Sequence, residues 1–173
     1  MNEDSPEIPS PLLRPEVHWS RATGYLKLGM LEQARIELAA LPDDLLWGKQ
    51  KKTMLMEIFQ RFEKWDSMQS FAYGLRMEFP QESEWWVADA YATRRCLSIE
   101  KAREILVEAL DYHYDDAIIH YNLACYACQL GSLSECLDFL KEAVNRNDRY
   151  KALALEDEDL KDVRAALQEM GWG

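Results

Sequence analysis

The residues of this chain whose side chains are best suited to metal binding or redox chemistry are its four cysteines. Cys125 and Cys128 form a CxxC pair, with His120 and Cys136 close in sequence. Zinc sites need four ligands, usually two pairs carried on loops, whereas this pair falls inside a helical pattern and has no second pair. A redox CxxC lies at a helix N-terminus, where the dipole lowers the thiol pKa. We therefore predict no metal site and interpret the cysteines as packing residues, with oxidation of Cys125 to Cys128 left open as the alternative.

The other residue types used in catalysis form no catalytic pattern. His18 and His120 share one position of the repeat described below, which holds Lys52 and Trp86 in the other copies, and we predict that they pack between helices. The sequence has no Ser/His/Asp arrangement, phosphate-binding loop or glycine-rich strand-to-helix turn. We therefore predict that the protein is not an enzyme and uses no cofactor.

The elements that position these residues follow from an internal repeat with a period of 34 residues. Five columns of apolar residues keep this period, which is the signature of a helical array. The columns are Ala22, Met56, Ala90 and Ala124; Ala34, Met68, Ala102 and Cys136; Leu38, Ala72, Leu106 and Leu140; Leu41, Leu75, Ala109 and Ala143; and Leu31, Trp65, Ile99 and Leu133.

The period also sets the domain organisation. We predict a disordered, acidic and proline-rich leader at 1–14 and a C-terminal capping helix and tail at 151–173, because terminal repeats need a polar outer face. Between them lie four repeats at 15–48, 49–82, 83–116 and 117–150.

Each repeat contains the signals of two helices. In the last repeat, apolar residues recur at helical spacing up to Leu130, and Gly131 then ends the helix. Ser132 and Glu135 have the spacing of a capping box, which predicts the start of the second helix. In the third repeat, Ser98 is the predicted N-cap. The small residues of the first two columns predict a close crossing of the paired helices.

The last repeat resembles the tetratricopeptide repeat family. The resemblance covers about residues 15–150, although Glu63 and Leu97 stand where the family has a glycine. It implies an all-α fold, namely a right-handed α-solenoid of antiparallel helix pairs, and a role in protein binding. The matching segments are Tyr121-Asn122-Leu123-Ala124-Cys125-Tyr126, Leu130-Gly131, Leu140-Lys141-Glu142-Ala143 and, in the first repeat, Tyr25-Leu26-Lys27-Leu28-Gly29.

The resemblance further implies that the first helix of each repeat lines a concave groove. Aromatic and arginine side chains are common interface hot spots, and arginine can hold a carboxylate with two hydrogen bonds. We therefore hypothesise a protein or peptide partner that is acidic or carries a terminal carboxylate. The predicted groove residues are Trp19, Thr23, Lys27, Glu57, Arg61, Tyr91, Arg94, Arg95, Tyr121 and Cys125.

Lys27, Arg61, Arg94 and Arg95, which we call the basic line, permit a second interpretation. They fall in the last turn of the first helices, where a cation complements the helix dipole without binding any ligand. The residues with which heat-shock co-chaperones hold a terminal carboxylate are missing in both registers that align with this sequence. We therefore predict that the protein is not a receptor for chaperone tails.

Charge and composition exclude some classes of partner and some cellular locations. A net charge of -11 disfavours nucleic acid and anionic membranes as partners, because both need basic surfaces. No targeting segment and no run of ~20 apolar residues is visible, which predicts a cytoplasmic protein. Acidic runs at Glu3-Asp4 and at residues 156–159 raise the hypothesis that one end of the chain contacts the basic line.

Three functions are compatible with these patterns. The first is a non-catalytic adaptor, or interaction scaffold, that binds a peptide or protein partner in its groove. The second is a self-associating module, with Trp47, Trp85 or Trp172 at a homo-oligomer contact. The third is a small acidic chaperone of the secretion type.

Overall fold

The computed structural model describes residues 13–172, and every regular element in that range is a helix. Residues 1–12 of the predicted leader lie outside the described part. The chain forms two compact units, one within residues 1–71 and the other within residues 72–173. Helix α4, Trp65–Glu78, contains the boundary between them. None of the described helices is long and apolar enough to cross a membrane.

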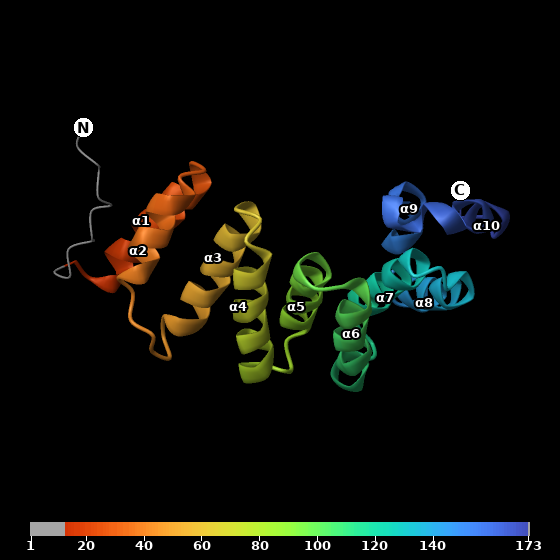
Figure 1. Ribbon diagram of the computed structural model, residues 1–173, viewed down its shortest axis with the longest axis horizontal. Coiled ribbons are helices and arrows are strands. Elements are labelled where there is room, and N and C mark those ends of the chain that lie inside the picture. Colours follow the sequence, from red (N-terminus) through yellow and green to blue (C-terminus); the bar gives the residue numbers. More distant parts are fainter. Residues whose placement is uncertain (1–12, 173) are drawn as a thin grey trace. The chain divides into compact units, whose positions relative to one another are not determined.

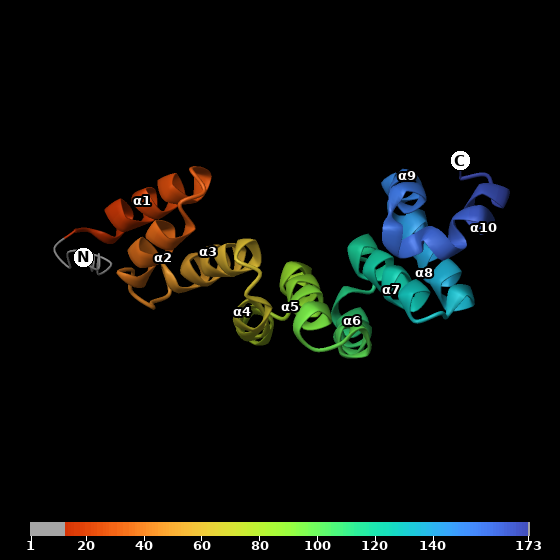
Figure 2. The same cartoon turned by 45° about the horizontal axis from the view of Figure 1, so that its top comes forward.

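The first unit is built around the packing of two short helices. Helix α1 packs along α2, and α2 contacts α3, as Figure 1 and Figure 2 show. The core contains Ala22 and Ala34, which are both fully buried, so that the backbones of α1 and α2 approach closely. The helices are α1 (Pro15–Lys27), α2 (Leu31–Ala39) and α3 (Gly48–Arg61).

The second unit contains two helix pairs and a C-terminal segment. Helix α5 packs on α6, and α7 packs on α8, while α6 and α7 join the pairs. The C-terminal elements pack on α7 and α8. The elements are α5 (Ser83–Cys96), α6 (Ile99–His113), α7 (Ala117–Gln129), α8 (Leu133–Arg146), α9 (Arg149–Glu156), the 3-10 helix η1 (Glu158–Val163) and α10 (Arg164–Glu169).

Most members of the apolar columns lie in the cores of the two units. In the second unit, Ala90, Ala102, Ala124 and Cys136 are all fully buried, so each helix pair has a small residue on both sides of its crossing. The column that begins at Leu31 differs, because its last member, Leu133, is exposed. The period therefore identifies the positions that face the paired helix. The column that begins at Leu31 is apolar, but its members do not all lie in the core.

Four helix ends, including the one at Gly171 with φ of +76°, share one backbone geometry. Gly29 and Gly131 have φ of +73° and +78°, and Glu63 adopts the same left-handed region with φ of +55°. After each, a backbone N–H returns to the carbonyl five residues earlier, as from Lys64 to Phe59 at 2.8 Å. This Schellman geometry satisfies carbonyls that the helix end leaves open. The turn at Glu63 is therefore kept although the glycine is absent.

Two predicted N-caps have different outcomes. The Ser98 hydroxyl accepts a hydrogen bond from the Lys101 N–H at 3.2 Å, which confirms the predicted cap of α6. The capping box predicted at Ser132 was wrong, since the Ser132 side chain makes no cap hydrogen bond. Glu135 instead pairs with Arg103 of α6. An ion pair to a neighbouring helix has displaced the local contact.

Candidate partner-binding surface

The predicted groove residues divide between the two units. Trp19, Thr23, Lys27, Glu57 and Arg61 belong to the first unit, and the other five belong to the second. Within each unit they lie on first helices of the predicted repeats, namely α1, α3, α5 and α7.

In the first unit, the Arg61 guanidinium contacts the end of a helix. Its Nη1 donates to the backbone carbonyl of Leu26, in the last turn of α1, at 3.1 Å. Its Nη2 donates to Glu57 at 2.7 Å. Open carbonyls at a helix C-terminus carry partial negative charge, so Arg61 complements the end of the neighbouring helix α1 and not that of its own helix α3.

The aromatic and hydroxyl groups of the first unit are used internally. The Trp19 ring lies 5.9 Å from that of Trp47, centroid to centroid, and both rings pack against the buried core. The Thr23 hydroxyl donates to the Trp19 carbonyl at 2.9 Å. Lys27 is exposed at the end of α1.

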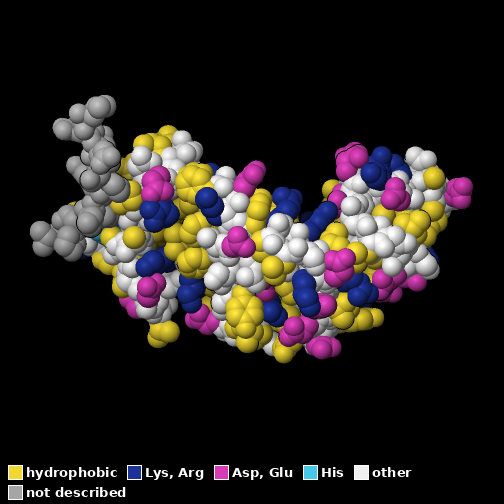
Figure 3. Space-filling view, viewed as in Figure 1, with side chains coloured by type: hydrophobic (Ala, Val, Ile, Leu, Met, Phe, Trp, Pro, Cys, Tyr) yellow, Lys and Arg dark blue, Asp and Glu magenta, His cyan; other side chains and the backbone are white. Residues whose placement is uncertain are grey.

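In the second unit, two residues of α5 form an aromatic and cationic pair. The Arg95 guanidinium carbon lies 4.7 Å from the centroid of the Tyr91 ring, a cation–π geometry. Arg95 is exposed and Tyr91 is half-buried. In Figure 3, basic side chains (dark blue) lie in the hollow of the surface between α5 and α9.

The neighbouring Arg94 contacts the acidic segment, residues 156–159. Its guanidinium donates two hydrogen bonds to the Asp159 carboxylate, with Nη2 2.9 Å from Oδ1. This bond raises the pKa of the guanidinium above its ordinary value. The same guanidinium carbon lies 5.5 Å from the Tyr126 ring centroid. Asp159 is therefore held against α5 and α7 by a forked ion pair.

Helix α7 contacts the same segment through a tyrosine and a glutamine. The Tyr121 hydroxyl donates to the Asp157 carboxylate at 2.8 Å, and the Gln129 amide donates to the Asp159 carbonyl at 2.9 Å. The Tyr121 ring also stacks on Tyr150 of α9, with centroids 4.6 Å apart. Burial is the main cause that raises the pKa of the Tyr121 hydroxyl. Tyr121 thus lies beneath the C-terminal segment.

The cysteines of α7 and α8 have the surroundings of packing residues. Cys125, Cys128 and Cys136 are buried and form no disulfide. Burial is the first cause that raises the pKa of each thiol, to about 12 for Cys136. A thiol that stays protonated is a poor nucleophile and a poor metal ligand.

Cys125, Asp157 and Asp159 place one potential ligand atom each within 4.8 Å of one another. A cation there would compete with groups already in place. The Asp159 carboxylate is neutralised by Arg94, the Asp157 carboxylate accepts the Tyr121 hydroxyl, and burial disfavours the Cys125 thiolate. The donor set fits a guanidinium better than a metal ion, and we assign no metal to it.

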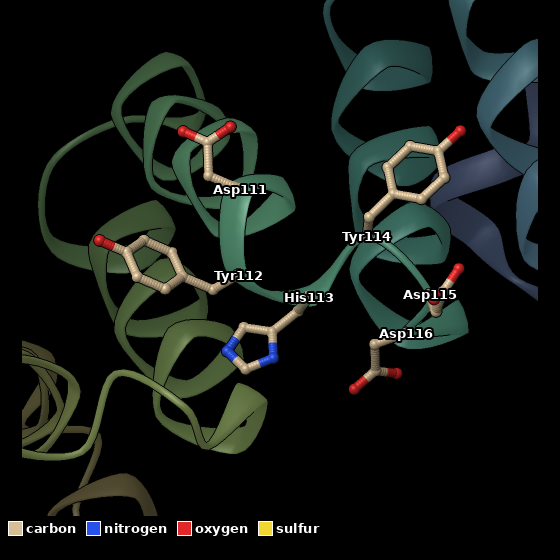
Figure 4. A pocket seen from close by; sticks show the side chains of 6 residues that line it. All are labelled: Asp111, Tyr112, His113, Tyr114, Asp115 and Asp116. Atoms are coloured by element: carbon tan, nitrogen blue, oxygen red, sulfur yellow. The ribbon is translucent and has the colours of Figure 1, made fainter.

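A depression of about 540 Å³ lies at the turn between α6 and α7 and is lined by residues 111–116. Figure 4 shows that the lining side chains point in different directions. Two of them have structural roles: Asp116 caps α7 by accepting the Ile118 N–H at 3.1 Å, and the His113 ring contacts the Pro80 carbonyl at 2.9 Å. The depression therefore presents no convergent set of groups.

Sequence reasoning found the basic and aromatic side of the α5–α7 contact but not the full acidic side. It named Arg94, Tyr121 and Cys125, and it noted that an acidic end of the chain suits the basic line. It did not single out Asp157 and Asp159 as the contacting residues. Their signal is the DxD spacing next to Leu160, which places two carboxylates just before a buried apolar residue.

Comparisons with known proteins agree with this description of the fold. No protein-family model matches the chain, and no curated protein matches its sequence. Among solved structures, MamA MSR-1 C2 matches with a TM-score of 0.65 and 19% sequence identity, covering 82% of this chain and 81% of its own. MamA is a tetratricopeptide-like protein. The paired helices and this likeness together show that the chain has the fold of a tetratricopeptide-type helical solenoid.

Proposed function

We propose that the chain is a non-catalytic interaction scaffold that binds a peptide or a partner protein through its first helices. Tetratricopeptide-type solenoids present the side chains of successive helices on an extended face suited to polypeptide binding. The observation that carries the proposal is the pair Tyr91 and Arg95 on α5. Tyrosine and arginine are typical hot-spot residues, and here the arginine is exposed beside Arg94.

A capture experiment with two charge-reversal variants tests the proposal. The full chain and a Tyr91→Ala, Arg95→Glu variant are immobilised, and proteins retained from a lysate of the source cells are identified by mass spectrometry. A Lys101→Glu variant is the matched control, because Lys101 is an exposed cation on α6 that pairs with Glu104 of the same helix. We expect a partner that the wild type and the control retain and the α5 variant loses. Equal retention by all three proteins argues against this surface.

Self-association is the second candidate, and one feature of the first unit favours it. Leu45 and Leu46, in the loop before α3, are exposed, and adjacent exposed leucines are unusual on a monomer surface. The tryptophans named from sequence fit less well, since Trp85 is buried and donates to Glu82 at 2.9 Å. Light scattering over a range of concentrations tests the candidate: a mass that stays monomeric rejects it, and a dimer lost in a Leu45→Ser, Leu46→Ser variant supports it.

A further inference from the structure

The acidic segment is bound to the second unit in the way that a separate peptide would be. Four side chains of α5 and α7 contact it, namely Arg94, Tyr121, Cys125 and Gln129. Their polar groups bind two carboxylates and one backbone carbonyl of the segment. A salt bridge, a hydroxyl and an amide directed at carboxylates and main chain are the contacts by which proteins hold an extended acidic ligand.

The local backbone presents both carboxylates to the same surface. Asp157 is the N-cap of η1, and its Oδ1 accepts the Asp159 N–H at 2.9 Å. The other oxygen, Oδ2, accepts the Tyr121 hydroxyl. Arg164 donates to the Asp157 carbonyl at 3.2 Å and fixes the turn from the other side. The side chain of the intervening residue, Glu158, is exposed and pairs with Arg164 at 3.3 Å, not with α5 or α7. The bound pattern is therefore two aspartates that contact α5 and α7, separated by one residue that contacts neither helix.

Apolar residues follow the aspartates at regular spacing. Leu160, Val163 and Leu167 are buried in the core shared with α7 and α8. Counted from Asp157, Leu160 and Val163 are the third and sixth residues on. The segment thus combines a polar contact at its start with an apolar contact along one side, as an amphipathic peptide does in a groove.

The ion pair of this contact is partly exposed to water, whereas the Tyr121 side chain is buried. The side chains of Arg94 and Asp159 are 23% and 31% exposed. An exposed ion pair exchanges partners more readily than a buried one, because water stabilises both charges when they separate. A competing carboxylate can therefore reach Arg94 before the apolar contact is broken.

We infer that the stretch from Asp157 to Val163 is an internal ligand, and that the partner of this surface is an acidic segment of another protein with the same pattern. That segment carries two carboxylates separated by one residue, followed by apolar residues three and six positions after the first carboxylate. It replaces the chain's own segment, so the free protein is held in a self-occupied state. This inference rests on the proposed function and specifies its ligand and its regulation.

The test uses the full chain and a labelled synthetic peptide with the sequence of residues 155–168. The peptide is titrated against the wild type and against an Asp157→Asn, Asp159→Asn variant, and binding is followed by fluorescence anisotropy. The variant loses the carboxylates that compete for Arg94 and Tyr121 but keeps its apolar anchors. We expect it to bind the peptide at least tenfold more tightly than the wild type does. Adding Arg94→Gln to the variant should abolish that gain, and a peptide with asparagine at both positions should not bind.

Equal binding to wild type and variant, or no binding to a folded variant, overturns the inference. A dimer of the variant that the peptide dissociates also overturns it, because the occupant would then be a second copy. If the variant does not fold, hydrogen exchange on the wild type decides. Excess peptide should speed exchange at residues 158–167, and unchanged exchange there means that the segment is a permanent part of the core. The proposed function is judged separately, by capture that depends on Tyr91 and Arg95.

Discussion

The guanidinium of Arg76 lies 2.8 Å from the carboxylate of Asp89, inside the second unit. The Asp89 side chain has no exposed surface, and that of Arg76 is 9% exposed. The guanidinium carbon also lies 4.6 Å from the centroid of the Trp86 ring. A charged pair thus joins the end of α4 to α5.

Removing one member of this pair should be strongly destabilising. Asp89→Ala leaves the Arg76 guanidinium beside Trp86 with one remaining carboxylate partner, the exposed Glu108 at 3.4 Å. Breaking a buried pair costs about 3–5 kcal/mol of unfolding free energy when no partner remains, so we expect a loss near the lower end of that range. Urea unfolding followed by circular dichroism measures the effect. Replacing both residues, as in Arg76→Met with Asp89→Leu, should cost clearly less than Asp89→Ala. A double variant less stable than the single one would contradict this account.

The left-handed residue Glu63 predicts a stabilising substitution. This conformation raises the free energy of a residue with a side chain by about 1–2 kcal/mol, whereas glycine adopts it without that cost. Glu63→Gly should therefore raise the unfolding free energy by about 1 kcal/mol. Glu63→Ala is the control, because alanine keeps the strain and should not stabilise the protein. The reverse change, Gly131→Ala, should destabilise it although no neighbour obstructs the added methyl group. Thermal unfolding of the three variants tests the series.

The sequence predicted the helix pairs because their cause is periodic. Small residues recur with the period at the helix crossing, and Ala22, Ala90 and Ala124 are buried as that spacing requires, whereas Met56 holds the same column and is half-buried. The capping box at Ser132 was wrong because Glu135 had a better partner in Arg103, from another helix. A local pattern cannot reveal such competition.

The contact of the acidic segment could not be predicted from the repeat. Arg94 and Asp159 are separated by 65 residues and Tyr121 and Asp157 by 36, and the aspartates belong to no column. Charge complementarity could predict that the acidic segment as a whole contacts the basic line. Only the path of the chain from α9 into η1 determines which carboxylate meets which helix.

The buried thiols predict a selective pattern of chemical labelling. Cys96 is half-buried, whereas Cys125, Cys128 and Cys136 are buried. At pH 8 a thiol with a pKa of about 12, as at Cys136, contains almost no reactive thiolate. We expect iodoacetamide to modify Cys96 in the native protein and the other three only in urea, as read by peptide mass spectrometry. Native labelling of Cys125 or Cys128 would contradict the packing role, and Cys96→Ser should remove the native reaction.

The same burial sets a pH dependence of stability. The Cys136 thiol titrates at about 12 in the folded protein, against an ordinary value of 9.0. Above about pH 9 the unfolded chain loses this proton and the folded one keeps it, so the equilibrium shifts toward unfolding. The contribution to stability is complete below pH 9 and is lost as the pH rises from 9 to 12. In urea titrations between pH 8 and 10, a Cys136→Ala variant should show a smaller loss of stability than the wild type.

Arg61 distinguishes the two interpretations of the basic line. Its bond to the Leu26 carbonyl joins α3 to the end of α1, and the loss of one such hydrogen bond costs about 0.5–1.5 kcal/mol. We therefore expect Arg61→Met to lower the unfolding free energy of the protein by that amount and to leave partner capture unchanged. Lys27→Met is the control, since Lys27 is an exposed cation in the last turn of α1 and should change stability little. If Arg61→Met instead keeps its stability and loses the partner, this arginine binds ligand and the carboxylate hypothesis extends to the first unit.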